Sequence, residues 1–279
     1  MSNKLQLNRY LIARRVTQVG ILFLYIMASL YGWKILSGNL SASLILDTVP
    51  LSDPFAIVQI LLSGSLVAFD AFIGAGIIFL LYALIAGRAF CSWICPVNMV
   101  SDLAFWLRTK LHIAQKLEEP NISRDTRYWI VALTLILSPI VGVGAFEFIS
   151  PVSILHRGIV FGIGVGWTVI LIIFLFDLVV LKRGFCGHLC PLGGFYSLIS
   201  RYSLIRVKHD HEKCTHCMKC FHVCPEEQVL PMIGEWSSAI TSGECTNCGR
   251  CIDVCHDDSL NFGLRTTETI SKTIIEKEV

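Results

Sequence analysis

Charged residues are scarce in this chain of 279 residues, because Asp, Glu, Lys and Arg make up 16% of the sequence while 54% of it is hydrophobic. Ordinary soluble domains carry about 25% charged residues, so this composition excludes a typical water-soluble protein. The net charge of +2 excludes little by itself, and we expect no nucleic-acid partner. The sequence therefore predicts a membrane protein with one polar end.

Histidine is absent from the four apolar stretches that are long enough to cross a bilayer. These stretches lie at about 16–36, 66–86, 128–148 and 159–181, and about 20 residues span the roughly 30 Å hydrocarbon core. Without histidines, the spans cannot supply paired axial ligands for a b-type haem. We expect residues 1–201 to form an α-helical membrane domain with four transmembrane helices.

Basic residues are also missing from one side of the expected topology. Four precede the first span, and six lie between the second and third spans: Lys4, Arg9, Arg14 and Arg15, then Arg88, Arg108, Lys110, Lys116, Arg124 and Arg127. The two opposite loops offer Arg157 alone. The positive-inside rule therefore predicts a multi-pass protein of the bacterial inner membrane with both termini in the cytoplasm.

Cysteine, in contrast, is abundant, and eight of the twelve cysteines form two runs of equal spacing. The runs read Cys214-x2-Cys217-x2-Cys220-x3-Cys224-Pro225 and Cys245-x2-Cys248-x2-Cys251-x3-Cys255. This is the spacing of bacterial two-cluster ferredoxins, in which the fourth cysteine of each run ligates the other cluster. We expect one [4Fe-4S] cluster on Cys214, Cys217, Cys220 and Cys255, and a second on Cys245, Cys248, Cys251 and Cys224.

Two other uses of these cysteines fit the pattern less well. Zinc sites normally use two cysteine pairs separated by a longer loop, and disulfides conflict with a cytoplasmic location. His256 stands where the second run would carry a proline, which leaves both ligand sets intact. We expect a ferredoxin-like α+β domain at 202–265, stabilised by its clusters because the segment is short, and a polar tail at 266–279.

The remaining four cysteines belong to a motif that occurs twice. Arg88-x-Phe-Cys91-x3-Cys95-Pro follows the second span, and Arg183-x-Phe-Cys186-x3-Cys190-Pro follows the fourth. The duplication predicts two related helical hairpins, with all four thiols at the same membrane depth on the cytoplasmic side.

Two interpretations of Cys91, Cys95, Cys186 and Cys190 stay open. In the first, the thiols converge on a further metal ion or cluster, or act as a redox-active pair. In the second, they are reduced cysteines that pack a helix boundary or a docking surface. The spacing does not decide, because Cys-x3-Cys is not a self-sufficient set of metal ligands.

Together, the two Cys-x3-Cys-Pro motifs and the two-cluster domain closely resemble the NapH family, the membrane ferredoxin-type subunits of periplasmic nitrate reductase systems. The resemblance covers nearly the whole chain. It implies an electron-transfer component of a quinol dehydrogenase, active only with a partner subunit. Electrons would pass from menaquinol or ubiquinol toward periplasmic nitrate reductase, with a NapG-like iron-sulfur subunit and other subunits of the system as partners.

Quinol oxidation needs an ionisable proton acceptor beside a redox centre. Asp70 and Glu147 lie near the outer ends of their spans, about 30 Å from the expected clusters. Asp177 and His188 lie near the inner face. We therefore expect Asp177 and His188 to line a quinol pocket there, although each carboxylate also fits a helix end in the headgroup layer, Asp70 at a helix N-terminus.

Two other classes of function stay open. In one, the chain is a metal-handling or maturation factor whose repeat thiols bind or reduce copper. In the other, it is a docking scaffold whose clusters are structural.

Overall fold

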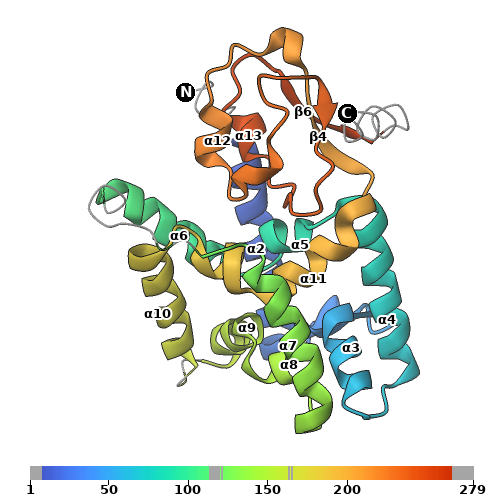
Figure 1. Cartoon of the computed structure of the whole chain (residues 1–279). Helices are drawn as coiled ribbons and strands as arrows, with labels where there is room; N and C mark the ends of the chain where they lie inside the picture. The colour runs from blue at the N-terminus through green and yellow to red at the C-terminus, as the bar shows by residue number, and fades with distance from the viewer. Residues whose placement is uncertain (1–7, 113–119, 121, 163, 165, 266–279) are drawn as a thin grey trace. The chain divides into compact units, whose positions relative to one another are not determined.

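The computed structural model describes residues 8–112, 120, 122–162, 164 and 166–265 (Figure 1). The chain divides into two compact units, one made of residues 1–15, 81–93 and 196–279, and the other of residues 16–80 and 94–195. The ferredoxin-like segment expected at 202–265 lies inside the first unit. That unit also includes the end of the second predicted span, which we had assigned to the membrane domain. The expected tail, 266–279, lies outside the described residues.

The first unit contains an antiparallel sheet with the strand order β5-β4-β6. The central strand β4 (Ile205–His209) pairs with β6 (Leu260–Leu264) over five residues and with β5 (Ser238–Ala239) over two. Its helical elements are η1 (Leu81–Ala86), α5 (Ala89–Trp93), η5 (Ser200–Tyr202), η6 (His211–Lys213), α12 (Lys219–Val223), η7 (Glu227–Val229) and α13 (Arg250–Asp253). This mixture of short helices and strands agrees with the α+β domain that we predicted.

The second unit consists mainly of helices. Wholly or in part it contains α2 (Arg9–Tyr31), α3 (Pro54–Leu62), α4 (Phe69–Leu80), α6 (Val97–Lys110), α7 (Thr126–Val141), α8 (Ala145–Ile149), α9 (Pro151–Phe161), α10 (Trp167–Leu175), η3 (Phe176–Val180), η4 (Phe185–Leu189) and α11 (Pro191–Ile199). The start of α3 follows from its local sequence. Asp53 caps the helix by accepting from the backbone N–H of Phe55 at 3.3 Å, and Pro54 is the first helical residue.

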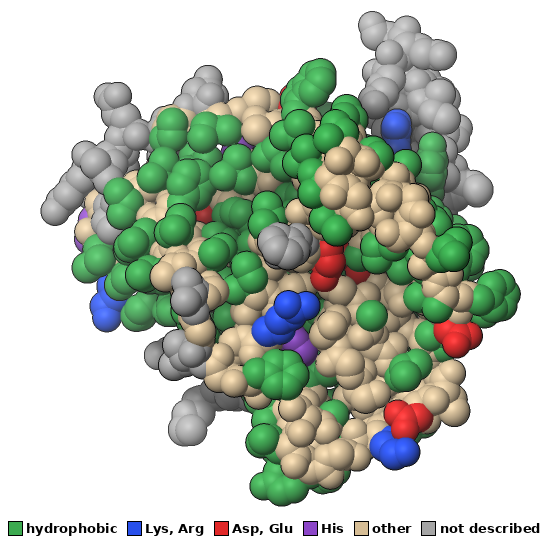
Figure 2. Space-filling model, turned by 90° about the horizontal axis from the view of Figure 1, so that it is seen from below, with side chains coloured by type: hydrophobic (Ala, Val, Ile, Leu, Met, Phe, Trp, Pro, Cys, Tyr) green, Lys and Arg blue, Asp and Glu red, His purple; other side chains and the backbone are tan. Residues whose placement is uncertain are grey.

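Two of the described helices are long and apolar enough to cross a membrane, namely Arg9–Tyr31 and Phe69–Ala86, in which η1 continues α4. At most 22% of the residues in the apolar window of either helix are buried inside the chain. Large apolar side chains are therefore exposed, and hydrophobic side chains are spread widely over the face seen in Figure 2, with few charged ones among them.

Glycines interrupt the third and fourth predicted spans. α7 ends at Val141 because Gly142 adopts a left-handed conformation with φ of 74°, and α9 ends at Phe161 before Gly162, whose φ is 102°. Only glycine enters this region without steric cost. Shorter apolar helices therefore occupy the expected spans at 128–148 and 159–181, and the four transmembrane helices stay a prediction.

A small antiparallel sheet that the sequence did not predict follows α2. It contains β1 (Leu36–Gly38), β2 (Ala42–Ile45) and β3 (Val49–Ser52), in that order. Leu46 and Asp47 both have positive φ angles, of 51° and 53°, as in the tight turn of a hairpin. Helix α4 packs closely on β3 at Gly74, where an added Cβ would lie 2.9 Å from the backbone of Pro50.

Candidate functional site

The two cysteine loops of the first unit have matching backbone conformations. In the first loop His216 and Met218 both have a φ of 56°, and in the second Asn247 and Gly249 have φ angles of 49° and 72° at the equivalent positions. Left-handed residues in such loops turn successive backbone N–H groups toward one concavity, the type of anion-binding nest found at iron-sulfur sites. The backbone of both loops therefore fits an anionic cluster.

One cavity of the first unit is lined by four cysteines from both runs, namely Cys224, Cys245, Cys248 and Cys251. Most of its other wall residues are apolar, and they include Val207, Val229, Leu230 and Ile240. The fourth cysteine of the first run thus joins the triplet of the second, which is the arrangement that the spacing predicts. Burial raises the pKa of Cys245 to about 11. A thiolate here therefore needs a positively charged centre such as iron.

The first run gathers its own triplet. Burial is the largest cause that raises the pKa of Cys220 to about 11, and the charges of Cys217 and Cys214 add to it. Cys255, the expected fourth member, packs against the same core as Cys214, and its Sγ lies 3.1 Å from the Oγ of Ser259. Cys217 is exposed, whereas all four cysteines around the cavity are buried. The first set is therefore the more accessible to solvent.

The cysteines are also part of the hydrophobic core of this unit. Cys220, Cys224, Cys245 and Cys251 belong to the same buried cluster as Val207 and the aliphatic residues of the neighbouring segments. A domain this short buries little apolar surface of its own. Bonds between these sulfur atoms and a cluster would therefore cross-link the core from within.

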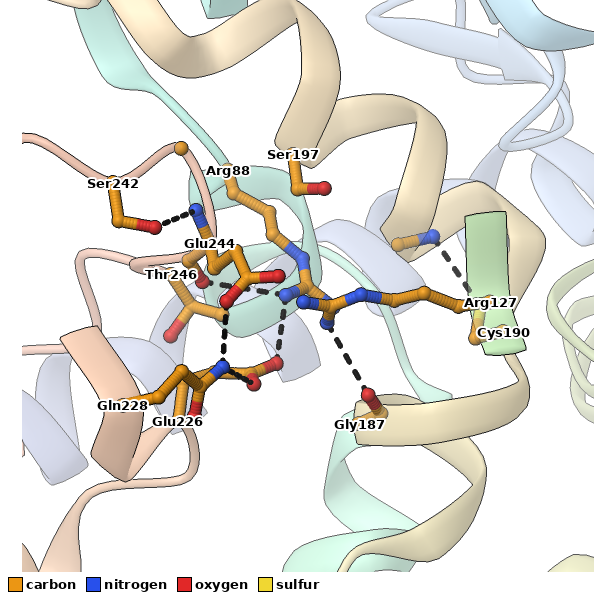
Figure 3. A network of polar contacts seen from close by, with 12 residues as sticks. Arg88, Arg127, Gly187, Cys190, Ser197, Glu226, Gln228, Ser242, Glu244 and Thr246 are labelled. Carbon is orange, nitrogen blue, oxygen red and sulfur yellow. Dashed lines mark hydrogen bonds and ion pairs between the residues drawn. The ribbon is translucent and has the colours of Figure 1, made fainter. Parts of the chain in front are cut away.

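Arg88, the first residue of the first repeat motif, forms a buried ion pair with Glu226 (Figure 3). Its Nη1 donates to Oε1 of Glu226 at 2.7 Å, and the two side chains are 2% and 3% exposed. Nη1 also donates to the backbone carbonyl of Glu244 at 3.3 Å. The second carboxylate oxygen of Glu226 accepts from Nε2 of Gln228 at 2.9 Å. Both charges of the pair are therefore compensated without water.

Helix α5 of the same motif holds the second cysteine loop. The hydroxyl of Ser92 donates to the carbonyl of Thr246 at 2.7 Å, and Nε1 of Trp93 donates to the carbonyl of Asn247 at 3.0 Å. Both carbonyls lie between the first two cysteines of that loop. The helix that carries Cys91 is thus part of the structure that shapes the second cysteine set.

The second repeat motif lies in the second unit, on η4. The carboxylate of Asp177 accepts a hydrogen bond from the backbone N–H of Phe185 at 2.8 Å and another from the hydroxyl of Ser101. The Oγ of Ser101 lies 3.4 Å from the Sγ of Cys186. A buried carboxylate and a repeat thiol are thus joined through one hydroxyl group.

Both repeat arginines lie beside buried carboxylates. Arg183 lies 3.9 Å from the carboxylate of Asp102, and these side chains are 5% and 9% exposed. This contact in the second unit parallels the Arg88–Glu226 pair in the first. The duplicated Arg-x-Phe-Cys sequence therefore brings a buried positive charge to each Cys-x3-Cys motif.

Three of the four repeat thiols gather in the second unit. Burial raises the pKa of the Cys186 thiol well above its usual range, and the charges of Asp177, Cys190 and Cys95 add to the effect. Cys91 belongs to the first unit. In the part of the chain that the structure describes, no group of three or more His, Cys, Asp or Glu side chains is arranged to hold a single metal ion. A third metal or redox site on these thiols stays a prediction.

The predicted quinol residues occupy different surroundings. Asp177 and His188 are both buried in the second unit, with exposed fractions of 0% and 7%, and His188 shares η4 with Cys186. Of the outer candidates, Asp70 lies in the first turn of α4, and Glu147 accepts from the hydroxyl of Ser41 at 2.6 Å. The structure therefore brings Asp177 and His188, but not the outer carboxylates, to a repeat motif.

Sequence reasoning missed the partners of the repeat arginines. Arg88 and Arg183 were visible because they recur at the same place in a duplicated motif. Glu226 and Asp102 belong to no repeated pattern, and Ser101 carries no signal of its own. Duplication of an arginine ahead of buried thiols was the one available indication that a carboxylate should be sought.

We expect Glu226→Gln to lower the free energy of unfolding by about 3–5 kcal/mol, because it leaves the buried guanidinium of Arg88 without a counter-charge. Denaturant unfolding of the purified protein, followed by circular dichroism, measures this loss. Asp210→Asn is the matched control, since it breaks the exposed Lys213–Asp210 pair, whose side chains are 60% and 39% exposed, and should change little. Equal stability of the two variants would contradict the assignment.

Two known families match this chain, one over the Cys-x3-Cys-Pro motifs and the other over the ferredoxin cysteines. A family described as "4Fe-4S binding domain" matches residues 67–114 and 161–209, and each of these segments contains one Cys-x3-Cys-Pro motif. A family described as "4Fe-4S dicluster domain" matches residues 206–256, which contain both ferredoxin runs. These matches bear out the iron-sulfur interpretation of the chain.

Relatives extend the similarity over most of the chain. The methylamine utilization ferredoxin-type protein MauN of Methylorubrum extorquens is 46% identical over 83% of this chain and 80% of its own length. The ferredoxin-type protein NapH is 46% identical in Haemophilus influenzae, over 80% of this chain and 77% of that protein, and 45% identical in Escherichia coli, over 82% and 80%. No solved structure matches the chain. The chain belongs to the family of NapH and MauN ferredoxin-type iron-sulfur proteins.

Proposed function

We propose that this protein is the membrane electron-transfer subunit of a NapGH-type quinol dehydrogenase, which takes electrons from menaquinol or ubiquinol and passes them toward periplasmic nitrate reductase. The observation that carries the proposal is the cavity lined by Cys224, Cys245, Cys248 and Cys251. This crossing of two cysteine runs is the ligand arrangement of two-cluster ferredoxins. Similarity to NapH over most of the chain supports the choice of system.

In this proposal the eight ferredoxin cysteines hold two clusters, one on Cys214, Cys217, Cys220 and Cys255 and the other on Cys245, Cys248, Cys251 and Cys224. A [4Fe-4S] group supplies one-electron storage at a potential set by its surroundings. The buried cysteines of the second set exclude water, and the exposed Cys217 leaves the first set near the surface. The first set is therefore suited to exchange with a NapG-like iron-sulfur subunit.

The membrane part of the proposal comprises four apolar segments in the bacterial inner membrane, as two duplicated hairpins. α2 and Phe69–Ala86 are long enough by themselves. The other two segments are the shorter apolar helices around Gly142 and Gly162. Broken helices are tolerated at membrane depth where surrounding protein satisfies the freed backbone groups. The uneven distribution of basic residues supports cytoplasmic termini.

Asp177 and His188 line the proposed quinol pocket. Quinol oxidation releases two protons and two electrons, so it needs a proton acceptor beside a redox centre. The hydrogen-bonded path from Asp177 through Ser101 to Cys186 supports this placement. His188 lies two residues from Cys186 on the same element and would take or relay the second proton.

The four repeat cysteines form a third proposed redox or metal site, made of Cys91, Cys95, Cys186 and Cys190. Support comes from the match of both motifs to a family described as "4Fe-4S binding domain". The competing physiological system is methylamine utilization, because MauN is as similar to this chain as NapH is. The terminal acceptor would then be selected by the partner subunits, since both relatives are ferredoxin-type proteins.

Anaerobically purified protein should contain about eight iron and eight sulfide per chain if two clusters are present, and about twelve of each if the repeat motifs hold a third. Replacing Cys91, Cys95, Cys186 and Cys190 with serine separates these cases. The iron and sulfide content should fall if the repeat motifs hold a third cluster and should stay unchanged if they do not. A colourless preparation would rule out the proposed clusters. Stoichiometric copper on the repeat thiols would instead support metal handling.

A protease-sensitive tag after Val279 should resist cleavage in intact spheroplasts and be cut only after the membrane is broken, because we place the C-terminus in the cytoplasm. A second tag inserted in the turn at Leu46 and Asp47 is the control, since the positive-inside rule places this loop on the opposite side. Cleavage of the C-terminal tag in intact spheroplasts would overturn the orientation.

Asp177→Asn and His188→Gln should each slow cluster reduction by a reduced quinone analogue by roughly 10²–10⁴-fold, as expected for loss of a proton acceptor. Reduction by dithionite should be unchanged, because it needs no quinol pocket. Asp70→Asn is the matched control on an outer carboxylate. Stopped-flow absorbance with iron content measured for each variant tests this, and the pocket assignment fails if Asp177→Asn behaves like Asp70→Asn.

A further inference from the structure

Arg206, on the central strand β4, carries a buried positive charge for which the described part of the chain offers no carboxylate partner. Its side chain is fully buried. Nη1 donates to the backbone carbonyl of Ser242 at 2.8 Å, and Nη2 donates to the backbone carbonyl of Ser200. Both acceptors are neutral. A buried charge with neutral partners alone is strongly unfavourable, so the structure requires a counter-charge near this guanidinium group.

The geometry places the second cysteine set beside Arg206. The carbonyl oxygen of Ser242 that accepts from Arg206 also accepts from the backbone N–H of Cys245 at 3.4 Å. The guanidinium group and the Cys245 thiol are close enough to interact electrostatically. The cysteine set that includes Cys245 can therefore supply the missing negative charge.

The other charged groups around Cys245 do not supply it. Glu226 is close enough to act on Cys245, but its carboxylate is already paired with Arg88 at 2.7 Å. Arg265 adds a second positive charge near Arg206, and its Nη1 donates to a backbone carbonyl at 2.9 Å. The carboxylate of Glu244, the residue before Cys245, accepts from Nε2 of Gln228 at 2.6 Å. Of the charged groups that act most strongly on Arg206, Cys245 has the opposite sign and Arg265 the same sign.

We propose that Arg206 is the built-in counter-charge of the [4Fe-4S] group held by Cys224, Cys245, Cys248 and Cys251, and that it raises the reduction potential of that group. The inference rests on the proposed ligand set. Four thiolates outweigh the charge of the iron-sulfur core, so the group is anionic, and one-electron reduction adds a further negative charge. A fixed positive charge nearby stabilises the reduced form more than the oxidised form. The electron comes from quinol in the proposed function and from dithionite in the test.

The test is a redox titration of the full-length protein with dithionite, followed by electron paramagnetic resonance, with iron and sulfide measured for every variant. Arg206→Met should lower the potential of one cluster by about 59 mV, corresponding to about a tenfold loss in its one-electron reduction constant, and leave the other cluster unchanged. Arg206→Lys keeps the charge but not the forked hydrogen bonds, and should stay near the wild-type potential.

Lys34→Met is the matched control, because it removes one positive charge from an exposed side chain of the second unit and should leave the potential near its original value. Where Arg206→Met fails to assemble its clusters, Arg265→Gln gives the second measurement and should lower the potential of the same cluster by a smaller amount. Unchanged potentials in iron-replete Arg206→Met, or in Arg265→Gln, would overturn the inference. Wild-type protein without iron would instead overturn the proposed function.

Discussion

Charge in a water-excluding interior is the constraint on which the first unit depends. Four buried cysteines line one largely apolar cavity, and burial raises the pKa of Cys245 to about 11. In the proposed function iron stabilises the thiolates, and the anionic group that results would be the counter-charge of the buried guanidinium of Arg206. Around it, the Arg88–Glu226 pair is satisfied within itself. The first unit therefore combines an ion pair of no net charge with a buried cation that has no carboxylate partner among the described residues.

The two copies of the duplicated motif make different contacts. In the first unit, α5 uses Ser92 and Trp93 to hold carbonyl groups of a cysteine loop. In the second, η4 is held at its start by Asp177, which accepts from the backbone N–H of Phe185. What both copies keep is an arginine beside a buried carboxylate. Each copy of the motif therefore places a buried arginine–carboxylate pair near its thiols, while the other contacts of the two copies differ.

The apolar helices show where local sequence is a sufficient guide and where it is not. Hydropathy located α2 and Phe69–Ala86, since length and composition alone define such a segment. It did not locate the helix breaks at Gly142 and Gly162, because hydropathy does not register a glycine that adopts a positive φ. The three-stranded sheet β1-β2-β3 escaped prediction because its strands of three and four residues are too short for a clear alternating pattern.

The sequence by itself determined the cysteine chemistry, the duplication and the apolar character, because a ligand spacing, a repeated motif and a composition are all local and need no fold to be read. Only the tertiary structure decided which charges meet. Glu226 lies 138 residues from Arg88 in the chain, and the carbonyl of Ser242 that accepts from Arg206 lies 36 residues from it. Such contacts follow from how strands and loops close over long separations, and no spacing rule within the sequence encodes them.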